Sequence, residues 1–217
     1  MTTHTSKTVK CSVCGKNSKQ IELASTSTFG SMDLDTRPAE MKRSTIDYWI
    51  TECKSCGYVA FSLEEPIGCD KEYLDTPEYR NFPGTPPSSK LAQLFIRAAR
   101  IAEKNQNHME AFWSYLHAAW VSDDKKDEAW QIELRMWALR MLERFREQDM
   151  GDNYRVIRAD LLRKTSQFKR LIQEYENIRF DNSLLNMIIQ FQISKAKAED
   201  TATYTVEDMK KLIFDII

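Results

Sequence analysis

The feature that most constrains this 217-residue sequence is a pair of short cysteine motifs, Cys11-x2-Cys14-Gly15 and Cys53-x2-Cys56-Gly57. Two residues between the cysteines allow both thiolates of a tight turn to bind one metal ion at about 2.3 Å. The glycine after each motif permits the positive φ that closes such a turn. Four thiolates complete a tetrahedral shell and leave no open position. The motifs therefore predict a zinc ribbon with one structural Zn²⁺ per chain, bound by Cys11, Cys14, Cys53 and Cys56.

Other uses of these cysteines fit the sequence less well. A redox CxxC motif lies at the strand-to-helix turn of a βαβ unit, and no such pattern surrounds either pair. Two disulfides would require an oxidising compartment. Soft thiolates also select iron, so iron remains the alternative metal. Cys69 follows Gly68 as a fifth cysteine and is interpreted as a bystander. His4 is not expected to compete with a complete set of four cysteines.

The distribution of proline indicates a boundary. Five of the six prolines fall between residues 66 and 90. Because proline has no backbone N–H to donate, this segment cannot continue a helix or a central strand. We therefore predict a four-cysteine ribbon domain with a long insert at 1–66, a proline-rich linker at 67–89, and a helical domain at 90–217. The aromatic residues Tyr73, Tyr79 and Phe82 indicate that the linker packs against other residues and does not move freely.

Residues 90–217 predict helices. This segment has no proline and one glycine, Gly151, which we expect to end the third helix in the left-handed conformation. Thr205 and Asp208 are spaced to cap the last helix. Apolar residues recur at helical spacing, as in the last stripe of Val206, Met209, Leu212, Ile213 and Ile216. The predicted fold class is α+β and mostly α: a small antiparallel β zinc ribbon followed by an all-α domain of helical hairpins.

One part of the helical domain has the spacing of a known repeat. Trp113, Leu116, His117, Trp120 and Ala129 follow the tetratricopeptide pattern, with histidine for glycine and tryptophan for tyrosine. The pattern favours degenerate helical-hairpin repeats over an irregular bundle. A concave repeat surface that exposes a tryptophan would suit the capture of a peptide or protein.

The insert between the motifs carries a resemblance. It contains Asp33-Leu34-Asp35-x-Arg37-Pro38, and the second motif continues as Cys53-Lys-Ser-Cys-Gly-Tyr-Val-Ala. With the first motif, these segments resemble the prokaryotic domain-of-unknown-function family twenty-two twenty-five, as do Arg158-Ala-Asp-Leu-Leu-Arg and Thr205-Val-Glu-Asp near the C-terminus. Members pair a ribbon of this kind with a tetratricopeptide-like helical tail. The resemblance covers most of the chain and implies an architecture without an activity.

The charged residues of the insert have two interpretations. Asp33, Asp35 and Glu40 lack a nearby histidine or nucleophile that would complete a second metal site or a catalytic group. A hydrogen-bonded turn that orders the loop is one interpretation. The other is a contact with a partner through Asp33, Asp35 and Arg37, because the loop is long, polar and held beside a rigid metal site.

Charge and missing motifs narrow the class of function. Lys and Arg number 31 and Asp and Glu 32, so no global field attracts nucleic acid or an anionic membrane. The first ten residues hold no apolar run typical of a signal peptide, which predicts a cytoplasmic protein. No phosphate-binding glycine motif or catalytic constellation is present, so we predict no catalytic residues. We predict a zinc-binding adaptor that binds a protein or peptide. The alternative is a nucleic-acid-binding zinc-ribbon protein with contacts at Arg155, Arg158 and Arg163.

Overall fold

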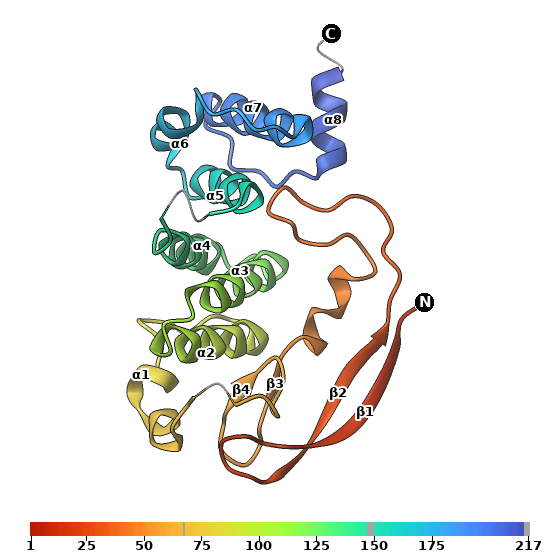
Figure 1. The fold of residues 1–217 in the computed structure, drawn as a ribbon, viewed down its shortest axis with the longest axis vertical. Helices are drawn as coiled ribbons and strands as arrows, with labels where there is room; N and C mark the ends of the chain where they lie inside the picture. Colours follow the sequence, from red (N-terminus) through yellow and green to blue (C-terminus); the bar gives the residue numbers. More distant parts are fainter. Residues whose placement is uncertain (67, 147–149, 215–217) are drawn as a thin grey trace. The chain divides into compact units, whose positions relative to one another are not determined.

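The computed structural model describes residues 1–66, 68–146 and 150–214 (Figure 1). The chain forms two compact units. The first comprises Met1–Thr28 and Glu40–Ala138, and the second joins Phe29–Ala39 to the helices after Ala138. The insert between the two cysteine motifs thus belongs to a different unit from the motifs themselves. The division into a ribbon domain at 1–66, a linker at 67–89 and a helical domain at 90–217 stays a prediction.

Two small antiparallel sheets frame the cysteines of the first unit. Strand β1 (Thr3–Lys10) precedes the first motif and β2 (Asn17–Ser25) follows it. The two strands pair as a hairpin, with Val9 opposite Ser18. The shorter β3 (Thr51–Glu52) and β4 (Val59–Ala60) flank the second motif. The segment before β3 contains the 3₁₀ helix η1 (Arg43–Tyr48).

Helices complete the first unit: η2 (Lys71–Asp75), α1 (Pro77–Arg80), α2 (Lys90–Lys104), α3 (His108–Asp124) and most of α4 (Glu128–Leu142). The ribbon and these helices share one core. Tyr73 and Tyr79 from the proline-rich segment and Ile101 from α2 are buried against Val9 and Cys11. This confirms that the linker packs, and it shows that the ribbon has no hydrophobic core separate from the helices.

The second unit contains α5 (Asp152–Lys164), α6 (Phe168–Tyr175), α7 (Ser183–Lys197) and α8 (Val206–Phe214). A polar group of three buried side chains lies between α5 and α7. Arg163 donates to Asp160 and to Gln192, and Gln192 also donates to Asp160 at 2.8 Å. Each of these three side chains forms at least one hydrogen bond, which offsets much of the cost of burying it. Asp160 Oδ2 is the atom among them that has no partner within the described residues.

The helix ends share one turn. Four non-glycine residues adopt positive φ directly after a helix: Gln106, Lys126, Ser166 and Glu199. In each turn, the amide of the next residue donates to the carbonyl five positions earlier, as Asn107 does to Ala102 at 2.8 Å. This is the Schellman arrangement of a helix C-terminus. The first three turns lead directly into the next helix, so the helical hairpins repeat one geometry. Assignment to tetratricopeptide repeats remains a prediction.

The fold class predicted from the sequence is confirmed: a small N-terminal antiparallel sheet precedes a mostly helical chain. Thr205 and Asp208 form the predicted cap, because each side chain accepts from the other's backbone amide at 3.0 Å. The expectation for Gly151 is wrong. It has φ −63° and ψ 152° and precedes α5. Ile216 and the side chain of Ile213 lie outside the described residues. None of the described helices combines the length and apolarity needed to cross a membrane.

Candidate metal centre

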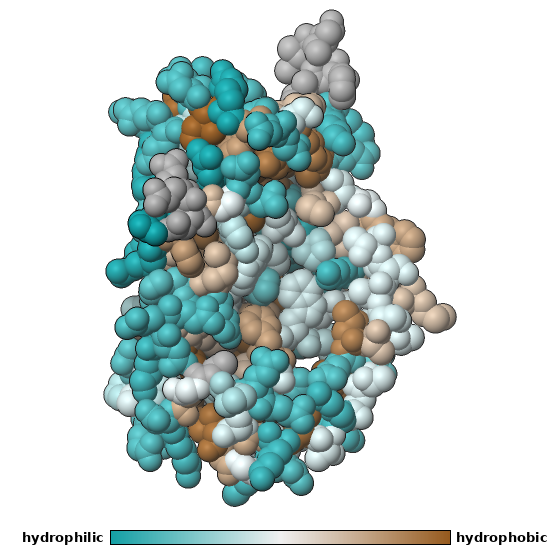
Figure 2. Space-filling view, in the orientation of Figure 1, coloured by the Kyte–Doolittle hydropathy of each residue, from teal (hydrophilic) through white to brown (hydrophobic). Residues whose placement is uncertain are grey.

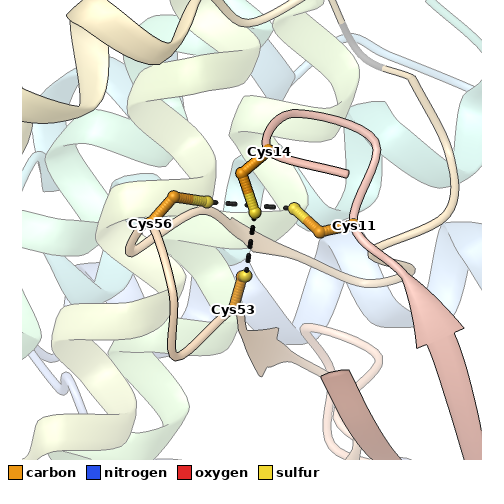
Figure 3. A group of neighbouring side chains, drawn as sticks. All are labelled: Cys11, Cys14, Cys53 and Cys56. Atoms are coloured by element: carbon orange, nitrogen blue, oxygen red, sulfur yellow. Dashed lines mark hydrogen bonds between the residues drawn. The ribbon is translucent and has the colours of Figure 1, made fainter. Parts of the chain in front are cut away.

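The four cysteines of the two motifs converge on one point, although more than 35 residues of sequence separate the motifs (Figure 3). Their Sγ atoms all lie within 4.8 Å of one another. Cys11 Sγ lies 3.8 Å from Cys56 Sγ, and Cys14 Sγ lies 3.7 Å from Cys53 Sγ. A disulfide requires sulfurs about 2.05 Å apart, so these are four free thiols around a common centre.

The two turns that carry the cysteines have the same backbone hydrogen bonds. In the first, the Cys11 amide donates to Lys16 O at 3.0 Å and the Gly15 amide donates to Cys11 O at 2.9 Å. In the second, Cys53 and Gly57 repeat this pattern at 2.7 and 2.8 Å. Both glycines have positive φ, +69° and +76°, which a side chain would strain. The sequence predicted both turns, because the motif is local.

Residues outside the motifs hold the two turns together. The Ser12 amide donates to Leu63 O at 2.8 Å, which ties the first turn to the segment after β4. Tyr79 Oη donates to Gly57 O at 2.7 Å, which anchors the second turn to α1. The sequence reasoning identified Tyr79 as a packing residue and missed this contact. Its only sequence signal was an aromatic residue within a proline-rich segment.

The surroundings of the four thiols shift their pKa values in opposite directions. The backbone amide of Lys16 lowers the pKa of the Cys14 thiol to about 7. Burial raises the pKa of the Cys11 and Cys56 thiols in the metal-free chain. A bound cation would offset the free-energy cost of burying several negatively charged thiolates at one point.

A soft divalent metal ion fits this donor set. For metal–sulfur bonds of about 2.3 Å, the edge of a tetrahedron of four thiolates is about 3.8 Å. The sulfur pairs of Cys11 with Cys56 and of Cys14 with Cys53 already have that separation. Cys69 stands outside the cluster and donates to Asp70 O at 3.5 Å, and His4 stacks on Tyr48 with ring centroids 4.1 Å apart. These placements agree with a site of four cysteines within the described residues.

The insert lies in the second unit, against the segment that leads into α8. Leu34 N donates to Tyr204 O and Val206 N donates to Met32 O, both at 2.9 Å. Asp33, Asp35 and Arg37 are at most 5% exposed. Their burial favours the role of ordering the loop. Partner contact through these three side chains stays a prediction. The exposed large apolar side chains between Phe29 and Ala39 are those of Phe29 and Met32.

The three arginines proposed as nucleic-acid contacts lie in different environments. Arg163 is fully buried, and its guanidinium donates to Gln192, Asp160 and the carbonyls of Asp200 and Ala202. A phosphate has no access to it in this fold, so its role is structural.

Arg158 and Arg155 are partly accessible and already have acidic neighbours. Burial alone would lower the pKa of Arg158, but its hydrogen bonds to Glu174 and Tyr175 outweigh burial and raise it. Arg155 lies 3.4 Å from an Asp152 oxygen and over the ring of Phe180. Since a phosphate would compete with these partners, neither arginine is an open cationic contact.

No protein-family model, curated protein or solved structure matches the chain. The resemblance to the family named above therefore stays a hypothesis.

Proposed function

We propose that Cys11, Cys14, Cys53 and Cys56 hold one structural zinc ion and that the chain is a protein-binding adaptor built around it. The observation that supports zinc is the separation of the sulfurs, 3.7 and 3.8 Å, which suits a four-thiolate zinc shell. Four cysteines fill the coordination shell of zinc, so the ion would stabilise the fold and would not bind a substrate. Elemental analysis of the purified chain should find about one zinc per chain, and iron in its place would contradict the proposed metal.

The adaptor role rests on an exposed apolar surface of α4. Ile132 and Met136, one helical turn apart, are 48% and 39% exposed. Beside them is a hollow of about 840 Å³ that includes Pro83, Pro86, Ala129 and Trp130 in its wall. Trp130 is held there because its Nε1 donates to Thr85 O at 3.0 Å. Exposed apolar side chains next to an apolar hollow are typical of protein-interaction sites.

Charge at this hollow indicates the kind of partner. The exposed lysines Lys125 and Lys126 line it together with two acidic residues, Asp127 and Glu133. Asp127 accepts from the Ser88 amide at 3.0 Å, whereas the two lysines stand at solvent-exposed positions. We propose that the partner presents an extended peptide, with an apolar side chain for the hollow and an acidic side chain for the two lysines. Electrostatic complementarity of this sort sets orientation and association rate more than affinity.

A photo-crosslinking amino acid at Ile132 tests the adaptor surface. The matched control is the same amino acid at Ile21, which is 50% exposed on the ribbon hairpin. We expect a crosslinked protein at position 132 alone, and we expect Lys125→Glu with Lys126→Glu to weaken that crosslink. Equal crosslinking at both positions, or crosslinking that ignores the lysine substitutions, would contradict the proposal. Neither result depends on which metal fills the site.

A further inference from the structure

Charge is unevenly distributed along the ribbon. The first 21 residues contain four lysines and no acidic residue, whereas residues 26–66 contain four basic and seven acidic residues. Summed over residues 1–66 the charges cancel, which hides the segregation. The lysines belong to the β1–β2 hairpin and its turn: Lys7, Lys10, Lys16 and Lys19.

The hairpin has a buried face and an exposed face. Val9 and Gln20 are 1% and 3% exposed and point to the interior of the first unit. Side chains alternate along a strand, so Thr8 and Lys10 lie on the opposite face of β1. Their cross-strand partners Lys19 and Asn17 share that face.

On the other face of the hairpin, two glutamates share one lysine. Lys7 lies 2.9 Å from a Glu22 oxygen and 3.1 Å from a Glu64 oxygen, which accounts for one lysine and two glutamates. By contrast, Lys10, Lys16 and Lys19 are exposed and form no ion pair with other residues that the structure describes. Figure 2 shows hydrophilic residues gathered over the tip of this hairpin, at the bottom of the view.

The first cysteine turn positions two of these lysines. An ideal Cβ on Gly15 would lie 3.7 Å from Lys10 Cε, so the aliphatic part of Lys10 passes over the first turn. The backbone amide of Lys16 acts on the Cys14 sulfur, which fixes the backbone of that lysine. Four thiolates around one divalent ion would carry a net charge of about −2, which offsets part of the positive charge of the three lysines. Cys11 and Cys53 are buried, and Cys14 and Cys56 are partly exposed.

We propose that the exposed face of the β1–β2 hairpin binds the phosphate backbone of duplex DNA. Three lysines, with the hydroxyl of Thr8 and the amide of Asn17, are the donors that commonly contact phosphate. The major groove of B-form DNA, about 12 Å wide, admits a two-stranded ribbon, whereas the deep, narrow major groove of duplex RNA does not. Residues 5–20 contain no aromatic side chain, so the hairpin has no platform on which single-stranded bases stack.

The test is fluorescence anisotropy of the full metal-loaded chain with a labelled 20-base-pair DNA duplex at several salt concentrations. Three phosphate contacts predict a slope of about −2.7 in log affinity against log salt, or a loss of about 40-fold between 50 and 200 mM salt. Replacing Lys19 by Ala should reduce the slope by about 0.9. The triple variant Lys10→Glu, Lys16→Glu and Lys19→Glu should abolish binding.

A control separates local from global charge. The variant Lys90→Glu, Lys169→Glu and Lys197→Glu changes the net charge equally at exposed positions off the hairpin. It should retain most of the affinity, and both triple variants should keep the metal content and circular dichroism of the parent chain. Absence of binding at low salt, equal loss in the two variants, or equal affinity for polyglutamate, for duplex RNA or for a single strand would overturn the proposal.

Discussion

Lys164 Nζ lies 3.6 Å from Asp35 Oδ2, and their side chains are 5% and 1% exposed. This buried ion pair joins the insert to α5, across almost 130 residues of sequence. Lys164 also donates to Thr203 Oγ1 at 2.9 Å, next to the segment on which Leu34 and Met32 form their backbone hydrogen bonds. Asp35 therefore connects two distant segments of the chain within the second unit.

We predict that Asp35→Ala lowers the free energy of unfolding by about 3 to 5 kcal/mol, because it leaves a buried lysine without its counter-ion. The double variant Asp35→Ala, Lys164→Met should lose less than the sum of the two single variants. Urea denaturation followed by circular dichroism measures both effects. Asp152→Asn is the control. Asp152 pairs with Arg155 at an exposed position, so its substitution should lower the free energy of unfolding by less than about 1 kcal/mol. Similar losses for Asp35→Ala and Asp152→Asn would contradict a role for the buried pair.

The left-handed turns predict a stabilising substitution. Lys126 has φ +54°, a conformation that costs a residue with a side chain about 1 kcal/mol and glycine almost nothing. Lys126→Gly should therefore raise the melting temperature, with up to about 1 kcal/mol of added stability. Lys125→Gly is the control, because Lys125 has φ −91° and should only lose stability. If both substitutions lower the melting temperature equally, the turn geometry is not the one described.

Acid should release the metal from the cysteines. Thiols must lose their protons to bind a metal, and burial raises the pKa of Cys11 and Cys56, so protons compete with the metal at neutral pH. Below pH 7, protonation of Cys14, whose pKa is about 7, adds a further proton. Log affinity should rise with pH by at least about 2 per unit above pH 7.5, and by at least about 3 per unit well below pH 7. Competition with a chromophoric chelator between pH 6 and 8 measures this slope, and a pH-independent affinity would contradict thiolate ligation.

The parts of the molecule that local chemistry determines were predictable from the sequence. The cysteine spacing and its glycines determine the two turns, and the apolar periodicity after Lys90 determines the helices. Gly151 was misinterpreted because glycine also begins helices: α4 ends at Leu142, and Gly151 directly precedes α5.

Long-range relationships were not predictable in the same way. No local pattern connects Asp35 with Lys164, and a charged loop looks solvated until its partner is known. Likewise, Arg163 belongs to a basic helix in sequence but is buried among its own partners. A net charge summed over residues 1–66 does not reveal the cluster of lysines on the hairpin. Because side chains alternate along a strand, Lys10 and Lys19 lie on the face opposite the acidic side chains.

X-ray absorption at the zinc edge of the purified chain tests the central claim most directly. The sulfur positions predict a single shell of four sulfurs at about 2.3 Å, unchanged by Cys69→Ser and disrupted by Cys53→Ser. A shell containing nitrogen or oxygen ligands in the parent chain, or a zinc signal that survives Cys53→Ser unchanged, would contradict the assignment of the four cysteines as the metal site.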